Sequence, residues 1–235
     1  MLVLGIDTST DVLSLSLADR GALRGAVKLG SHTKVPDRRP REHSEQLMPA
    51  LDELLRLCGC KPSDLEGIAV VHGPGGFTGI RTGLTVAKTV SQALGLPIVG
   101  IPSLELLVRS YPGIGLLSPM LDARRGEVFA ALYRKTEDGV EVLMKEGLWH
   151  LSEWLEAIRH YEEKISFIGE GAVRYESEIR TENRTPISFS DGSYAAVLGE
   201  AWLLEGRRDN ALSLLPAYLR LPSMVVKQQQ KDARP

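Results

Sequence analysis

Four glycines within a seven-residue segment, placed between two apolar stretches, constrain the fold of this chain more than any other feature. The β-branched run Ile68–Val71 before them predicts a buried strand, and residues 78–94 after them have helical spacing. Glycine lets a backbone approach a ligand closely, and the first N–H groups of a helix attract anions, so one interpretation is a phosphate-facing loop. The other is a tight turn whose glycines serve packing alone. Spacing favours neither, and no Lys follows the last glycine as it does in a P-loop. The loop residues concerned are Gly73, Gly75, Gly76, Thr78 and Gly79.

The first hundred residues predict the order β-β-β-α-β-α-β. In the second strand Leu13, Leu15 and Leu17 alternate with serines, which indicates a half-buried strand. Gly59 ends the first helix, and Pro102 ends the last strand. The expected strands are 2–6, 12–18, 22–29, 68–71 and 98–99, and the expected helices are 42–58 and 78–94.

The second half predicts a looser copy of the first. A helix at 103–110 leads to three strands, a helix, a strand that ends in Gly169-Glu-Gly171, and a last helix at 194–205. We therefore expect an α/β protein with a first subdomain at 1–102, a second at 103–222 and a frayed tail at 223–235. The last helix and the Pro-x-Tyr-x-Arg segment at 216–220 are the parts that could return to the first subdomain. The remaining predictions are strands at 116–122, 128–133, 140–147 and 165–169 and a helix at 151–161.

Composition narrows the class of protein. The 235 residues carry a formal net charge of −2, which argues against RNA binding by this chain alone, since phosphate contacts need a basic face. Cys58 and Cys60 are the only cysteines, and one intervening residue is poor geometry for a disulfide and gives half a zinc site at best. Free thiols, no signal peptide at the start and no long apolar run together predict a cytoplasmic protein.

Two polar turns are further candidates for chemistry. Asp7, Thr8 and Ser9 follow the first strand, where they could hold a metal or contact phosphate, but we favour hydrogen bonds to their own turn backbone. The charged turn 122–127 is more consistent with a solvated hairpin, with docking or ligand contact as the alternative. No pair of histidines has the spacing of a helical metal site.

Several segments, taken together and in this order, resemble the bacterial TsaB (YeaZ) family. The resemblance is strong over residues 1–130 and reappears at 216–220. The sequence departs from the family at Gly76, where Ser is usual, which removes one hydroxyl from the loop. The matching segments are Gly-Ile-Asp-Thr-Ser at 5–9, His-Ser-Glu at 43–45, Gly-Pro-Gly-Gly-Phe-Thr-Gly-Ile-Arg at 73–81, Asp-Ala-Arg-Arg-Gly-Glu-Val at 122–128 and Pro-Ala-Tyr-Leu-Arg at 216–220.

The resemblance implies an actin-like ATPase (ASKHA, ribonuclease H-like) fold with two tandem β-β-β-α-β-α subdomains. It also implies a heterodimer with the catalytic paralogue TsaD, which works with TsaE to transfer threonylcarbamoyl to N6 of an adenosine next to the anticodon of tRNAs that read ANN codons. ATP or ADP and a metal ion are expected in the partner subunits, tRNA is reached through the complex, and a homodimer is expected when the chain is alone. TsaD needs two His at i and i+4 on its first helix. Here Leu47 follows His43, so we expect no catalytic residues and no metal of its own.

The two long helices are the expected partner interface. Their apolar stripes could cover the sheet, and part of each must, but we expect the other edge of each helix to meet TsaD. A small actin-fold kinase or hydrolase that acts through Asp7 is the rival hypothesis. A glycoprotease finds no support, because Ser44 and Ser103 have no evident base. The expected interface residues are His43, Leu47, Leu51, Leu54, Ile80, Leu84, Ala87 and Ser91, and the residues of the candidate docking turn are Asp122, Arg124, Arg125 and Glu127.

Overall fold

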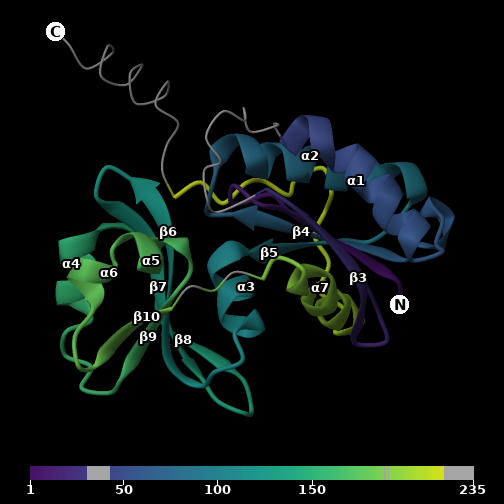
Figure 1. The fold of residues 1–235 in the computed structure, drawn as a ribbon. Helices are drawn as coiled ribbons and strands as arrows, with labels where there is room; N and C mark the ends of the chain where they lie inside the picture. The colour runs from purple at the N-terminus through teal and green to yellow at the C-terminus, as the bar shows by residue number, and fades with distance from the viewer. Residues whose placement is uncertain (31–42, 188, 190, 220–235) are drawn as a thin grey trace, which may run out of the picture.

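The computed structural model describes residues 1–30, 43–187, 189 and 191–219. The predicted tail at 223–235 lies outside these residues, as does Arg220 of the Pro-x-Tyr-x-Arg segment. The chain forms two lobes, each built on one five-stranded sheet, with a short helix between them (Figure 1). Within the described residues, no helix is both long and apolar enough to span a bilayer.

The sheet of the first lobe has the strand order β3-β2-β1-β4-β5. The first three strands are antiparallel neighbours, whereas β4 runs parallel to β1 and β5 parallel to β4. The predicted β-β-β-α-β-α-β order is confirmed, and most boundaries shift by one or two residues. The strands are β1 (Val3–Asp7), β2 (Leu13–Asp19), β3 (Ala22–Leu29), β4 (Gly67–Gly73) and β5 (Ile98–Pro102).

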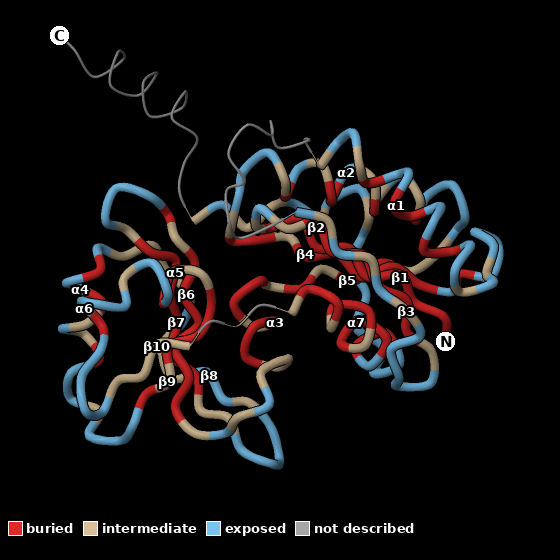
Figure 2. The backbone as a smooth tube through the Cα atoms, in the orientation of Figure 1, coloured by how far each residue is buried: buried red, intermediate tan, exposed pale blue. Residues whose placement is uncertain are grey.

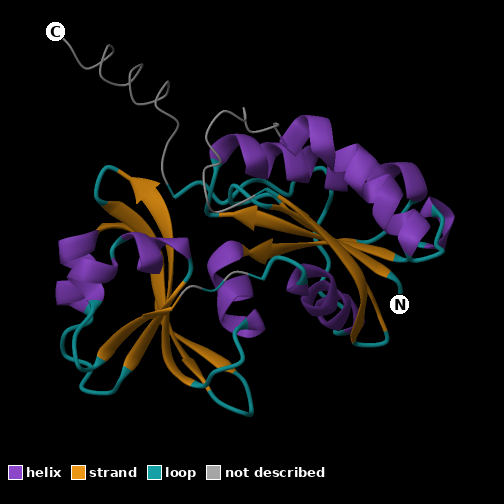
Figure 3. Ribbon diagram, viewed as in Figure 1, coloured by secondary structure: helices purple, strands orange, loops and turns teal. Residues whose placement is uncertain are grey.

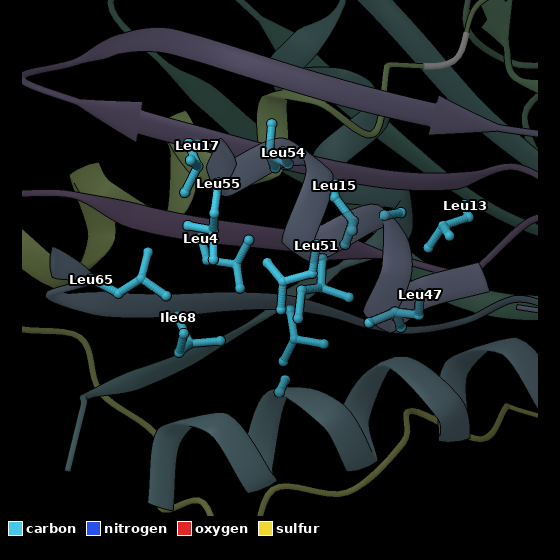
Figure 4. Close-up of a cluster of buried hydrophobic side chains, with 14 of the residues drawn as sticks. Leu4, Leu13, Leu15, Leu17, Leu47, Leu51, Leu54, Leu55, Leu65 and Ile68 are labelled. Atoms are coloured by element: carbon cyan, nitrogen blue, oxygen red, sulfur yellow. The ribbon is translucent and has the colours of Figure 1, made fainter. Parts of the chain in front are cut away.

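Helices cover both faces of this sheet (Figures 1 and 3). The long helices α1 (His43–Leu57) and α2 (Phe77–Leu94) lie side by side on one face, and α7 (Tyr194–Leu204) lies on the other. Leucines of β2 point toward α1 and α2 and join the leucines of α1 in one buried cluster (Figure 4). Burial of such side chains stabilises the lobe by roughly 1.5–3 kcal/mol for each residue.

The prediction that β2 is half-buried is wrong, because its serine face is covered as well. Ser14 and Ser16 are 2% and 0% exposed, and Ser16 Oγ accepts a hydrogen bond from the Ala196 amide of α7 at 3.3 Å. Small residues let α7 come this close: a Cβ on Gly5 would lie 2.4 Å from the Ala196 nitrogen. The period-two alternation correctly separated the leucine face of β2 from its serine face. The serine face is buried as well, because small residues let α7 pack on it.

The second lobe repeats the arrangement of the first. Its order is β10-β9-β6-β7-β8, with the hairpin-connected strands antiparallel and β6, β9 and β10 parallel. This pair of matching mixed sheets is the actin-like, ribonuclease H-like fold that the resemblance implied. The strands are β6 (Gly115–Arg124), β7 (Glu127–Lys135), β8 (Val140–His150), β9 (Ile165–Ile168) and β10 (Arg184–Ile187).

Short helices replace the long pair of the first lobe. Buried side chains of α4 (Leu151–Ala157), α5 (Glu170–Arg174) and α6 (Glu176–Ile179) pack on one face of the second sheet. The sequence patterns missed α5, α6, β10 and the 3₁₀ turn Pro62–Asp64, because all are too short to show a period.

The helix α3 (Ser103–Ser110) connects the two lobes. Its Leu106 belongs to the buried cluster of the first sheet, whereas Leu104 and Leu107 belong to that of the second. After the second lobe the chain comes back: α7 packs on the first sheet, and residues 209–218, the return segment, run along β5 and α2. The first lobe therefore contains the beginning of the chain and residues 194–218, and Leu219 then packs on the buried cluster of the second sheet.

Candidate functional site

The two loops that the sequence singled out meet at one edge of the first sheet. The turn Asp7–Ser9 follows β1 and the loop Gly73–Gly79 follows β4, and these strands are parallel neighbours, so their carboxyl ends lie together. Thr8 Oγ1 donates a hydrogen bond to the Gly79 carbonyl at 2.7 Å, and the Gly76 amide donates to the Ser9 carbonyl at 2.7 Å. The N–H group of Gly76, the N-cap residue of α2, is thus used by the chain itself.

The glycines allow this contact. A Cβ on Gly79 would lie 2.1 Å from the Thr8 carbonyl oxygen, and one on Gly75 would lie 2.3 Å from the Ser9 carbonyl oxygen. Gly76 has no such constraint, since its nearest atom would be 3.5 Å away. Packing of turn against loop is therefore a sufficient reason for two of the glycines. A phosphate-facing role of the loop stays a prediction, and Thr78 at its end is exposed.

Asp7 is buried at this edge. Its Oδ1 accepts hydrogen bonds from the amide and the hydroxyl of Ser9, at 2.9 and 2.7 Å. The turn Asp191–Ser193, just before α7, lies directly against the other carboxylate oxygen, because a Cβ on Gly192 would be 2.6 Å from Oδ2. Burial raises the pKa of the Asp7 carboxyl, although Ser9, His43 and Lys28 oppose the shift. The space in front of Asp7 is filled by the chain.

Lys28 holds this covering turn in place. Its Nζ lies 2.8 Å from Asp191 Oδ1, and Asp191 also accepts hydrogen bonds from the amide and hydroxyl of Ser193. Lys28, whose charge acts on Asp7, therefore already has a carboxylate partner.

His43, which was predicted at the partner interface, lies beside the two loops, and its interface role stays a prediction. Its Nε2 is 2.8 Å from the Thr10 carbonyl, and its Nδ1 is buried with no hydrogen-bond partner among the described residues. One helical turn further on, Leu47 is fully buried. Among the residues that the structure describes, no three His, Cys, Asp or Glu side chains are grouped as a metal site requires.

The other predicted interface residues form the core of the first lobe, and this corrects the sequence-based assignment. Each of them is at most 5% exposed, because the apolar stripes of α1 and α2 face the sheet (Figure 4). A partner cannot reach these side chains in the folded chain. The residues are Leu47, Leu51, Leu54, Ile80, Leu84, Ala87 and Ser91.

Both α1 and α2 have exposed stretches on the side away from the sheet (Figure 2). Between the start of α1 and the first half of α2 lies a hollow of about 410 Å³, which we call the outer groove. Sequence reasoning marked Thr78 as a loop residue but did not identify this group as an interface, because hydroxyl groups with one Phe and one Val do not form an apolar stripe. The spacing of Thr78, Thr82 and Thr85 on α2 is the signal that could have indicated a second face. The groove is lined by Ser44, Phe77, Thr78, Arg81, Thr82, Thr85 and Val86.

One end of the outer groove is formed with the return segment. The rings of Phe77 and Tyr218 are stacked with centroids 4.9 Å apart. The Arg81 guanidinium lies 4.4 Å from the Phe77 ring centroid, and its Nε donates to the Tyr218 hydroxyl at 2.9 Å. The Gly-rich segment and the Pro-x-Tyr segment, which the sequence marked separately, are therefore in contact.

The charged turn of the second lobe is a hairpin between β6 and β7. The Asp122 carboxylate is largely buried: Oδ1 accepts from the Arg124 amide at 2.9 Å and from the Tyr175 hydroxyl at 3.2 Å, and Oδ2 lies 3.3 Å from Arg174 Nε. Arg124 and Arg125 both have left-handed backbones, with φ of +69° and +59°, and both are exposed. The turn, which ends at Glu127, is therefore bonded to Arg174 and Tyr175, and its docking role stays a prediction.

Comparison with known proteins gives consistent matches over nearly the whole chain. Residues 32–224 match the family described as TsaD, tRNA N6-adenosine threonylcarbamoyltransferase. The tRNA threonylcarbamoyladenosine biosynthesis protein TsaB of Bacillus subtilis is 35% identical over 235 residues, which cover 97% of each chain. TsaB of Escherichia coli is 30% identical over 143 residues, 60% of this chain and 58% of that one.

Solved structures agree with the sequence matches. A Pseudomonas aeruginosa protein, described as having similarity to peptidase YeaZ, superposes with a TM-score of 0.76 at 25% identity. The superposition covers 93% of this chain and 99% of that one. A second structure, YeaZ from the same species, gives a TM-score of 0.72 at 22% identity and supports the fold.

Proposed function

The chain belongs to the TsaB (YeaZ) family of tRNA threonylcarbamoyladenosine biosynthesis proteins, and from this we propose that it is a non-catalytic subunit that binds and activates TsaD. TsaE completes the set, and tRNA is reached through the complex. ATP or ADP and the metal ion belong to the partner subunits. When the chain is alone, the surface that receives TsaD makes a homodimer, since paralogues share the fold.

The burial of Asp7 is the observation that supports a non-catalytic role. A carboxylate that binds a metal or orients phosphate must face an open space, whereas Asp7 faces Gly192 and bonds to its own turn. Burial also raises its pKa, which disfavours the ionised form that a metal ligand needs. Leu47 occupies the position at which a metal-binding pair on α1 would need its second histidine, and it is fully buried.

The outer faces of α1 and α2 support the partner role. These are the two longest helices of the described chain, and only their inner stripes are used by the core. A typical specific interface buries about 1,600 Å² in total, which two adjacent helices of this length can supply. We therefore move the proposed interface from the buried stripes to the outer groove, with the exposed Met48 beside it on α1.

A groove variant tests the interface. Thr85 is exposed in the groove, so Thr85→Arg adds a long cationic side chain without disturbing the core. We expect at least a tenfold rise in the Kd for TsaD, measured by calorimetry, and a matching loss of tRNA modification in a reconstituted reaction. Val142→Arg, on an exposed position of β8 in the second lobe, is the matched control and should bind as wild type does. Leu47→Asp or Leu84→Asp would report on folding instead, since both side chains are buried.

Two results would reject the proposal. One is full tRNA modification by TsaD and TsaE without this chain. The other is turnover of a nucleotide by the chain alone that disappears in Asp7→Asn, as the kinase or hydrolase hypothesis expects. The partner role predicts that Asp7→Asn supports tRNA modification as well as wild type does.

A further inference from the structure

The contact between the return segment and α2 joins two segments that are far apart in the sequence. Tyr218 is 137 residues from Arg81 in the sequence, yet it stacks on Phe77 and accepts a hydrogen bond from Arg81. The Phe77 and Tyr218 rings remain 38% and 36% exposed, so the chain itself does not bury this cluster. Stacked aromatic rings with an arginine, partly exposed at the rim of a groove, have the composition of an interface hot spot.

The backbone fixes Tyr218 where it is. The Asp209 amide donates to the Ile98 carbonyl at 2.8 Å, and the Ala217 amide donates to the His72 carbonyl at 2.8 Å. Between these two points Lys88 Nζ lies 3.1 Å from the Leu214 carbonyl. The return segment is therefore anchored to β5, α2 and β4 in turn, and Tyr218 follows the last anchor directly. A ring held in this way loses little conformational entropy when a partner covers it.

The charge of the groove indicates what the partner offers. Arg81 is the only ionisable side chain among the groove residues, and no carboxylate of the described residues pairs with it. Its Nε is engaged by Tyr218, which sets the plane of the guanidinium and leaves the two Nη groups for another acceptor. Two parallel N–H groups match a carboxylate in bidentate geometry.

We propose that Tyr218 is a positioning residue for partner binding. It holds Phe77 as an aromatic anchor and holds Arg81 ready for a carboxylate on TsaD. This inference rests on the proposed function and makes the return segment, and not only α1 and α2, part of the interface.

A double-mutant cycle on the full chain tests the positioning role. Arg81→Ala should raise the Kd for TsaD about tenfold, and Tyr218→Phe, which keeps the stacked ring but loses the hydroxyl, about threefold. The double variant should bind no more weakly than Arg81→Ala, because the hydroxyl acts only through Arg81. Tyr218→Ala should have the largest effect of the Tyr218 variants. All variants should unfold at the wild-type temperature to within a few degrees.

A second substitution on the return segment serves as the control. Leu212 is 75% exposed on the same segment but does not line the groove, so Leu212→Ala should leave the Kd unchanged. Raising the salt concentration should weaken wild type more than Arg81→Ala, because only wild type has the charge pair.

The outcomes separate this inference from the proposed function. If Thr85→Arg weakens binding to TsaD and Tyr218→Ala does not, the inference is overturned and the proposed function stands. If neither variant has an effect, both fail. Strictly additive effects of Tyr218→Phe and Arg81→Ala on the Kd for TsaD would also overturn the inference. So would variants that weaken self-association but leave the affinity for TsaD unchanged, since the cluster would then bind a second copy of this chain.

Discussion

The two lobes have the same strand order, but different contacts fill the end of each sheet at which the first and fourth strands finish. In each lobe a turn with an Asp follows the first strand and a glycine-containing loop follows the fourth: Asp7 and Gly73–Gly79 in the first lobe, Asp122 and Gly169–Gly171 in the second. Both carboxylates bond to their own turn, but Asp7 is buried beneath Gly192, whereas Asp122 also binds Arg174 and Tyr175. Equal topology has therefore not kept an equal site.

The elements that follow the loops differ as well. The Gly73–Gly79 loop leads into the 18 residues of α2, but the Gly169–Gly171 loop leads into an α5 of five residues. A long helix has an outer face left over after its inner stripe covers the sheet, while a helix of one turn does not. Helix length, and not the strand arrangement, therefore decides which lobe can offer a partner surface.

A methyl group added at Gly79 tests the contact between the Asp7–Ser9 turn and the glycine loop. It should lower the free energy of unfolding more than the other substitutions in this comparison. Because the added Cβ would lie 2.1 Å from the Thr8 carbonyl oxygen, a backbone atom, Gly79→Ala should lower the free energy of unfolding by about 3 kcal/mol. Urea denaturation followed by circular dichroism measures it. Gly76→Ser restores the residue usual in the family and has 3.5 Å of clearance, so it should change stability by less than about 0.5 kcal/mol.

Equal stability of Gly79→Ala and Gly76→Ser would contradict the packing role of the loop. It would mean that turn and loop can separate at little cost, as a site that opens for a ligand requires.

Most of the fold could be predicted from the sequence, because long periodic segments determine it. The helix at 103–110 was predicted with its observed bounds, and the seven elements of the first lobe appear in the expected order. The return of the last helix to the first subdomain was among the expectations and is confirmed. Which face of the sheet it covers, and therefore the burial of Ser16, could not be derived, since no local pattern states which helix covers which face. The position of α7 depends on close approach at Gly5, which is a contact between residues far apart in the sequence.

The candidate site was predicted less well. The sequence marked Asp7 and the glycine loop, but not that Gly192 would lie against Asp7. The apolar stripes of α1 and α2 were detected correctly and then assigned to the wrong side, because periodicity shows that a face is buried without showing what buries it. The outer groove has only Val86 and Phe77 as large apolar residues, so hydrophobicity alone could not point to it.

Removal of the Asp122 side chain tests the second lobe and should have a smaller effect. Asp122→Ala leaves the Arg124 amide and the Tyr175 hydroxyl without their acceptor, and both are partly exposed, so water compensates in part. We expect a loss of about 1 kcal/mol in the free energy of unfolding, again measured in urea. The Arg174 pair adds little, since that side chain is mostly exposed. A loss of unfolding free energy as large as that of Gly79→Ala would show that the turns after the first strands matter equally for the stability of the two lobes.

The charge of Asp7 should have the smallest effect on the free energy of unfolding. The direction in which this effect changes with pH distinguishes Asp7 from the neighbouring Asp191. Burial raises the pKa of Asp7 above its ordinary value of 3.8, so the folded chain favours the protonated form, and stability falls as the pH rises from that value through the folded pKa. Burial alone would raise the pKa of Asp191 too, but hydrogen bonds from Lys28 and Ser193 lower it overall, so its contribution is present at neutral pH and is lost as the pH falls through the folded pKa. Asp7→Asn should therefore be more stable than wild type at pH 7, and Asp191→Asn less stable. The Asp7 difference should vanish below pH 3.8, and the Asp191 difference should shrink as the pH falls toward the folded pKa of Asp191. Urea denaturation between pH 3 and pH 7 measures both variants, and a destabilised Asp7→Asn at pH 7 would mean that the first lobe keeps Asp7 ionised, as an active carboxylate site does.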